Sequence, residues 1–364
     1  MRKQSKMVHN MDLQLAQGLE SQASFSCPRP SGKGELSQRV EALLQGEPLR
    51  VLDVGARGGL HALFLPIADQ TEIIGFDPDQ KECERLSHLV QSQGWRSARL
   101  ISCAVSGQGG GRVLYSTRRP ELSSLLLPCC ASSPDWEVVH TDYLCTESFA
   151  GLRATGQLAG RWDYLKIDVQ GLEYELLQHM PADLAEDLVG VEVEGRIQQH
   201  YRGQRSLAEL IDLMLARGFE LVAFDPVFEG GSSIDLTDPW PPSRRRLSHG
   251  DLLFLRPRGW AETKGSTAQA QRAYAARLAT IALLHGFWTL ALALVGDFLP
   301  EHSEALRTLL PAREYSWRWR WRTLRLALSL LIRPNRQRRF LLARQALAVP
   351  GKDGHHWRLS PPKL

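Results

Sequence analysis

The chain has 364 residues, enough for one large domain with an appendage, and 43% of them are hydrophobic and 23% charged. This balance is typical of a globular protein and excludes a disordered one. The six cysteines form no CxxC pair and have no histidine at zinc spacing, so we expect free thiols in a reducing compartment. Residues 1–34 are polar and lack the apolar stretch of a secretory signal, so the expected location is the cytoplasm.

The net charge of +4 is unevenly distributed along the chain. Between Arg313 and Ala346, ten arginines and one acid give a local charge of +9, which leaves −5 on the rest of the chain. A mildly acidic body with a strongly basic segment near the C-terminus indicates that this segment has a role of its own.

Apolar runs alternate with helical patterns over the first 256 residues, which predicts β/α units. The expected elements are a helix over 36–44, a strand over 51–54, a helix over 60–68, a strand over 72–76, a helix from Asp79 to about 93 with Asp79 as N-cap, and a strand over 98–105. A glycine-rich turn at 107–111, an extended piece at 113–115 and a long loop over 117–134 follow, and long loops in compact domains are often functional.

The second half of this region continues the alternation. The expected elements are an extended piece at 136–139, a helical segment over 144–154, strands over 164–168 and 188–194, helices over 171–180 and 207–217, and a closing antiparallel pair at 219–224 and 251–255. The pattern predicts a Rossmann-like, mainly parallel sheet with helices on both faces, followed beyond 257–266 by a helical region.

The segment Val51-Leu-Asp-Val-Gly-Ala-Arg-Gly-Gly-Leu60 predicts a strand, a glycine turn and a helix. Glycines let a ligand approach the backbone closely, because they lack a Cβ and tolerate positive φ. The turn is not GxGxxG, and an acid, Asp53, precedes its first glycine, which favours S-adenosylmethionine (SAM) over a dinucleotide. A tight turn of another α/β protein stays open as an alternative. Asp77, at the tip of the next strand, is placed to bind a ribose hydroxyl.

A third acid, Asp168, ends the strand Tyr164-Leu-Lys-Ile-Asp168, and Gly171 and Glu173 follow it. Because ligands bind outside the carboxyl ends of strands in open α/β sheets, we expect Asp53, Asp77 and Asp168 to converge on one edge. Glu173 falls in a first helical turn, where the helix dipole favours an acid regardless of further roles.

The chain resembles the FkbM family of SAM-dependent methyltransferases over about residues 48–256. The segments that carry the resemblance occur in the family's order: Val51-Leu-Asp-Val-Gly-Ala-Arg-Gly-Gly59, Gly75-Phe-Asp77, Cys103-Ala-Val-Ser106, Leu122-Ser-Ser-Leu125, Leu165-Lys-Ile-Asp-Val-Gln-Gly-Leu-Glu173 and Val191-Glu-Val-Glu194. Arg57 departs from the family, where a small polar residue such as Asn is frequent. The resemblance implies a seven-stranded class I methyltransferase sheet and methyl transfer from SAM to a hydroxyl of a sugar, glycolipid, polysaccharide or secondary metabolite.

The resemblance also assigns site residues. The expected cofactor-binding residues are Asp53, Gly55, Arg57, Gly59, Asp77 and Ala104. Asp168 is expected to be the base or the substrate orienter, with Glu173 and Glu194 next, and Ser123 and Ser124 are expected to contact the substrate. No metal is predicted, although Asp168 with Glu192 or Glu194 offers hard ligands. His140 and His200 are less favoured bases. The alternative function is a non-catalytic SAM- or glycan-binding module in which Arg57 marks a degraded pocket.

The region after the sheet divides into helices and a tail, and we expect domains at 35–258 and 267–348 between a loose segment 1–34 and a tail 349–364. Residues 278–295 carry no charge, but His285 and Gly286 interrupt them, which favours a buried helix or helical hairpin over a membrane span. Tryptophans and arginines alternate from Trp317 to Arg322, which predicts that residues 315–345 bind an anionic membrane surface, peripheral to its inner face. A helix packed on the domain with solvated arginines stays open as the alternative. Nucleic acid is not expected, since the acidic body does not extend the basic surface.

Overall fold

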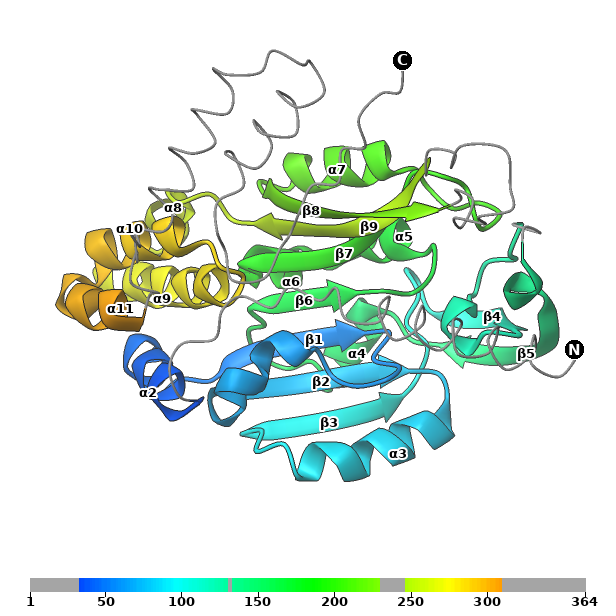
Figure 1. Cartoon of the computed structure of the whole chain (residues 1–364), viewed down its shortest axis with the longest axis horizontal. Coiled ribbons are helices and arrows are strands. Elements are labelled where there is room, and N and C mark those ends of the chain that lie inside the picture. Colours follow the sequence, from blue (N-terminus) through cyan, green and yellow to red (C-terminus); the bar gives the residue numbers. More distant parts are fainter. Residues whose placement is uncertain (1–32, 130–132, 230–245, 310–364) are drawn as a thin grey trace, which may run out of the picture. The chain divides into compact units, whose positions relative to one another are not determined.

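The computed structural model describes residues 33–129, 133–229 and 246–309 (Figure 1). Residues Lys33–Leu309 form one compact unit. Two predicted segments lie outside the described residues: the loose segment 1–34, apart from its last two residues, and the segment 315–345, for which membrane binding is a prediction.

Seven strands form the main sheet, in the order β3-β2-β1-β6-β7-β9-β8. Their bounds are β1 Leu49–Val54, β2 Thr71–Asp77, β3 Ser97–Ser102, β6 Tyr164–Ile167, β7 Gly190–Arg196, β8 Glu220–Glu229 and β9 Arg246–Leu255. Strands β3, β2, β1, β6 and β7 pair in parallel, and β9 is antiparallel to both of its neighbours. The expected seven-stranded class I methyltransferase sheet, with its closing antiparallel pair, is therefore confirmed.

The strand pattern separates the two faces of the sheet. Leu52, Val54, Leu165 and Ile167 point to one face and belong to the main apolar core. The helices α4 (Phe149–Ala154), α5 (Glu173–Gln178), α6 (Ala182–Asp187) and α7 (Leu207–Ala216) supply buried side chains to this core. The intervening residues of the same strands, including Asp53 and Lys166, point to the opposite face because side chains alternate along a strand.

Two predicted helices depend on capping residues that the sequence already contains. Asp79 caps α3 (Gln80–Gln91) by accepting hydrogen bonds from the amides of Lys81 and Glu82, as expected. Ser206 and Glu209 form a capping box at the start of α7. The helix α2 (Lys33–Leu44) also lies where the sequence places one.

The structure corrects two local predictions. The helix expected over 60–68 is a 3₁₀ helix, η1 (Ala62–Gln70), which contains Pro66 and a non-helical Ile67. The helical segment expected over 144–154 begins only at Phe149, because β5 (Val138–Thr146) pairs with β4 (Gly110–Thr117) in an antiparallel hairpin. The sequence analysis did not find this hairpin as a unit, and it missed α6.

The residues after the sheet fold as helices α8 (Trp260–Lys264), α9 (Ala268–Leu284), α10 (Trp288–Phe298) and α11 (Ser303–Leu309). The uncharged stretch 278–295 is a helical hairpin, as expected, and its turn lies at Gly286, which has a φ of +80°. Within the described residues, no helix is both long and apolar enough to cross a bilayer. Figure 1 shows α9–α11 at one end of the sheet and the β4–β5 hairpin at the other, beyond the carboxyl ends of the parallel strands.

A buried ion pair connects α9 to the sheet. Arg277 Nε lies 3.2 Å from Asp163 Oδ1, and both side chains are almost fully buried. The same aspartate accepts hydrogen bonds from the backbone amide of Arg50 and from Arg161 Nε. Burial lowers the pKa of Arg277, and the charge of Asp163 opposes this effect.

Removing one member of this pair should destabilise the whole unit. We expect Arg277→Ala to lower the free energy of unfolding by about 3 kcal/mol, because it leaves Asp163 buried without one of its cations. The control is Arg258→Ala, which removes an exposed pair with Asp297 and should cost less than about 1 kcal/mol. Urea denaturation measures both, and equal losses would contradict a special role for the buried pair.

Candidate active site

The site lies where the direction of the strand order reverses, between β1 and β6. Val54 pairs with Phe76 on one side and with Ile167 on the other, so the next residues, Asp77, Gly55 and Asp168, reach the carboxyl rim side by side. A Cβ on Gly55 would lie 1.9 Å from the carbonyl oxygen of Asp168, and Gly55 has a φ of +89°. Only glycine fits this contact, and a crevice at such a reversal point is the usual ligand site of an open α/β sheet.

Asp53 lies one pleat behind this rim, level with Gly75 and Lys166. It is 1% exposed, accepts a hydrogen bond from the His61 amide (2.8 Å) and lies 3.6 Å from Lys166 Nζ. Asp53 does not line the cavity described below, and neither does Gly59. Asp53 supports the glycine turn from behind, because its carboxylate binds the amide of His61, which follows the turn.

Lys166 links the glycine turn to Asp168. Its ammonium donates to the Gly55 carbonyl at 3.2 Å and lies 3.6 Å from an oxygen of Asp168. Burial alone would lower the pKa of Lys166, but the charges of Asp53 and Asp168 raise it above its usual value. The lysine therefore stays charged between these two carboxylates.

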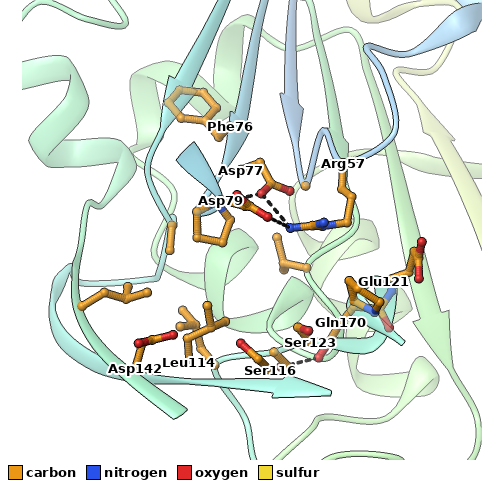
Figure 2. Close-up of a pocket in the computed structure, with 18 of the residues that line it drawn as sticks. Arg57, Phe76, Asp77, Asp79, Leu114, Ser116, Glu121, Ser123, Asp142 and Gln170 are labelled. Carbon is orange, nitrogen blue, oxygen red and sulfur yellow. Dashed lines mark hydrogen bonds and ion pairs between the residues drawn. The ribbon is translucent and has the colours of Figure 1, made fainter. Parts of the chain in front are cut away.

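A cavity of about 1070 Å³ opens at the rim (Figure 2). It is larger than most single-ligand sites, which measure roughly 300–1,000 Å³, so it offers room for two reactants. Seven of the predicted site residues line it: Gly55, Arg57, Asp77, Ala104, Ser123, Ser124 and Asp168.

One side of the cavity is formed by the ends of β1 and β2. Arg57 Nη2 lies 2.9 Å from Asp79 and 3.5 Å from Asp77. Figure 2 shows how the Arg57 side chain reaches these two carboxylates. Asp77 Oδ1 also accepts the Asp79 amide at 2.8 Å. Burial raises the pKa of Asp77, and the Asp79 amide and Arg57 counteract this. Arg57 therefore helps to keep the carboxylate ionised. Phe76 borders the cavity, but its side chain is buried and belongs to the main apolar core.

The opposite side belongs to the β4–β5 hairpin and the long loop that joins its two strands. Leu114, Ser116 and Asp142 face the cavity from the hairpin (Figure 2). Arg112 attaches the hairpin to α5, because its Nη2 donates to both carboxylate oxygens of Glu175 at 2.8 Å. The sequence analysis missed these residues, because their approach to the rim depends on pairing between distant segments.

The predicted substrate residues Ser123 and Ser124 line the cavity, but their hydroxyls also hold the loop. Ser123 Oγ accepts the Thr117 amide at 3.1 Å, and Ser124 Oγ donates to the Gln170 carbonyl at 2.7 Å. Ser124 is only 2% exposed. The loop is thus built into the cavity wall.

Of the three predicted catalytic carboxylates, only Asp168 reaches the cavity, with its side chain 39% exposed. Glu173 is buried and accepts the amides of Val169 and Gly171, so it organises the turn behind Asp168. Burial raises the pKa of Glu173. Glu194 is buried and pairs with Arg196 at 2.5 Å.

Oxygen atoms of Asp168, Glu173 and Glu194 come within 4.8 Å of one another, which would suit a hard cation. These carboxylates, however, already accept hydrogen bonds from Gln170, from the Gly171 amide and from Arg196. Glu192 takes part in a different cluster, with His61 (3.0 Å) and the Tyr164 hydroxyl (2.8 Å).

The two less favoured histidines do not line the cavity. His140 is exposed and bonds to Asp142, which does line it, at 2.9 Å. His200 is 1% exposed and contacts Arg196.

A family model and several solved structures are similar to parts of this chain. Residues 53–221 match the model of the FkbM methyltransferase domain. No curated protein sequence matches the chain. Among solved structures, magnesium protoporphyrin IX methyltransferase from Synechocystis PCC 6803 with bound SAM is similar, at 15% identity and a TM-score of 0.31, over 62% of this chain and 79% of that one. Precorrin-6y C5,15-methyltransferase from Geobacter metallireducens GS-15 is similar at 10% identity and a TM-score of 0.29, over 63% and 92% of the two chains.

The contact between Gly55 and Asp168 can be tested with two glycines of the same turn. Gly55→Ala should lower the free energy of unfolding by more than about 3 kcal/mol, because the new methyl group meets backbone atoms that cannot yield. Gly58→Ala is the matched control, since Gly58 has a φ of +87° but nothing within 4 Å of its added Cβ. It should cost about 1 kcal/mol. Chemical denaturation that gives the same loss for both variants would contradict the close approach.

Proposed function

The chain carries a methyltransferase domain of the FkbM family, a family of SAM-dependent enzymes, and from this we propose that it transfers the methyl group of SAM to a hydroxyl oxygen of a sugar, glycolipid, polysaccharide or secondary metabolite. The observation that carries the proposal is the shared rim. Asp77 and Asp168 border the same cavity, and Gly55 lies between them.

The donor would lie on the β1–β2 side of the cavity. Asp77 ends β2, where an acid binds ribose hydroxyls in doubly wound folds. The glycine turn gives the ligand access to the backbone. Arg57 is the feature that departs from the family pattern, and its pairing with Asp77 and Asp79 supports the donor-binding acid.

SAM supplies a methyl carbon that is already activated by the positive sulfur. The task of the protein is to align a hydroxyl oxygen with this carbon and to accept a proton. As the new C–O bond forms, the C–S bond breaks and its electron pair stays on sulfur, which leaves S-adenosylhomocysteine (SAH). Asp168 takes the hydroxyl proton, so the products are SAH and a methyl ether. Before this step, the ammonium group of Lys166 lies 3.6 Å from the Asp168 carboxylate and balances its negative charge.

The acceptor would lie between Asp168 and the β4–β5 hairpin. Its wall combines apolar Leu114 with the hydroxyl of Ser116 and the carboxylate of Asp142. Short polar groups among apolar ones are the typical lining of a site that orients a hydroxylated molecule.

We also propose that the Arg/Trp-rich segment 315–345 brings the enzyme to an anionic membrane surface, where lipid-linked acceptors are found. The support is its composition: Trp suits the headgroup region, and each arginine near an anionic surface contributes about 1 kcal/mol.

Donor binding can be tested by calorimetry with SAH. We expect Asp77→Ala to weaken SAH binding at least about tenfold, because a bidentate partner of the ribose is lost. Asp183→Ala, which removes an exposed carboxylate paired with Arg153, is the control and should bind normally, because neither residue lines the cavity. Unchanged affinity in Asp77→Ala would mean that the ribose assignment is wrong.

The role of Asp168 can be tested by following label from methyl-labelled SAM into a panel of methyl glycosides. Asp168→Asn should lower turnover by about 10²–10⁴-fold while SAH still binds, because the amide cannot accept the proton. Full activity of this variant would exclude Asp168 as the base. SAH binding without transfer to any member of the panel by the wild type would favour a binding module.

The membrane proposal predicts flotation of the full-length protein with anionic liposomes. Replacing Arg318, Arg320, Arg322 and Arg325 by serine should greatly reduce flotation, and neutral liposomes should bind neither protein. Equal flotation of the two proteins on anionic liposomes would end this proposal.

A further inference from the structure

Gln170 has an unusual backbone for a residue with a side chain. It follows Asp168 by two positions, lines the cavity and has a φ of +57°. Within the described residues, Gln45 is the only other non-glycine residue with positive φ. Side chains rarely adopt this conformation, and such positions concentrate at functional sites.

The strained backbone places the Gln170 side chain at the centre of a hydrogen-bond network. Its Nε2 donates to Asp168 Oδ1 at 2.7 Å and lies 3.3 Å from Glu194 Oε2. Its Oε1 accepts from Arg196 Nη2 at 2.6 Å and lies 2.9 Å from the Tyr201 hydroxyl. Its own carbonyl accepts from Ser124, which belongs to the cavity wall.

The guanidinium of Arg196 determines which way the Gln170 carboxamide faces. A guanidinium has only donors, so the amide oxygen must face Arg196, and the NH₂ group must therefore face Asp168. Tyr201 lies beside the same carboxamide: its hydroxyl is 2.9 Å from both Gln170 Oε1 and the Leu122 carbonyl, and its one proton can be donated to only one of them.

The position also requires an amide rather than a carboxylate. Asp168, Glu173 and Glu194 already crowd within 4.8 Å of one another. Burial, together with the charges of Asp168 and Glu173, raises the pKa of Glu194, although Arg196 opposes this. A fourth carboxylate would repel the other three and would offer Asp168 no proton to bond.

We propose that Gln170 is a positioning residue, and that Arg196 and Tyr201 orient its carboxamide so that it holds the Asp168 carboxylate toward the reacting centre. Gln170 would touch neither donor methyl nor acceptor oxygen in this role, and would act through Asp168. This inference rests on the proposed function, since it takes Asp168 as the group beside the sulfonium.

The test compares the affinities for SAM and SAH by calorimetry. The two ligands differ in the positive sulfur and its methyl, so an ionised carboxylate that faces the sulfur favours SAM. We expect Asp168→Asn to reduce the ratio of SAM to SAH affinity about tenfold, as for the loss of one close charge pair. Gln170→Leu should reduce the same ratio about fivefold, because the released carboxylate no longer points at the sulfur.

The decisive result is the double variant. If Gln170 acts through Asp168, adding Gln170→Leu to Asp168→Asn should change the ratio no further. Gln198→Leu is the matched control, since Gln198 is another half-buried glutamine whose Nε2 bonds only to the Leu247 carbonyl in the described structure, and it should leave the ratio unchanged. Tyr201→Phe is a milder second variant if Gln170→Leu does not fold, and it should shift the ratio in the same direction.

The outcomes separate the inference from the proposed function. If Asp168→Asn leaves the ratio unchanged, Asp168 does not face the sulfonium, and the proposed chemistry fails together with the inference. If Asp168→Asn lowers the ratio but Gln170→Leu and Tyr201→Phe do not, only the positioning role is overturned. A loss of stability in Gln170→Leu with an unchanged ratio would likewise reduce Gln170 to a structural residue.

Discussion

The close approach of the β1 and β6 ends is the constraint on which the site depends. The carbonyl of Asp168 occupies the space where a Cβ of residue 55 would be, so the two strand ends can meet only because residue 55 is a glycine. This contact places Asp168 directly beside the glycine turn that follows β1. Only β1 then separates Asp168, at the end of β6, from Asp77, at the end of β2. A wider gap between the strands would separate the group that binds the donor from the group that we propose to accept the proton.

Buried charge behind the rim supports this contact. Lys166 bonds to the Gly55 carbonyl while lying near Asp53 and Asp168, so one cation holds both strand ends. The charge cluster continues one strand further, where burial would raise the pKa of Glu192 but His61 and Tyr164 lower it to about 2. Tyr164 bonds in turn to His285 at 2.9 Å, at the turn between α9 and α10. The helices after the sheet are therefore connected to the polar face that supports the site.

The sequence predicted most of the sheet because each strand and cap is encoded locally. Apolar runs, Asp79 as a cap and the break at Gly286 need only neighbouring residues to be interpreted. The β4–β5 hairpin could not be predicted in the same way, since its residues form a half-exposed ribbon whose pattern depends on the partner strand. Leu114, Ser116 and Asp142 reach the cavity through that pairing, so they carried no local signal.

The three acids illustrate how strand register limits such predictions. Asp53, Asp77 and Asp168 all follow apolar residues near a strand end, and the sequence treats them alike. The register sets Asp53 two residues earlier than the other two, level with Lys166, which corresponds to a displacement of about 6–7 Å along the strand. Asp53 is consequently buried as a support, and Gly55 takes the rim position between Asp77 and Asp168.

The same register places Glu194 beside Asp168, one residue beyond the Ile167–Val193 pair. This creates a crowding of carboxylates, which an amide at position 170 relieves. Glutamine at this position thus follows from the arrangement of the neighbouring strands rather than from any local pattern.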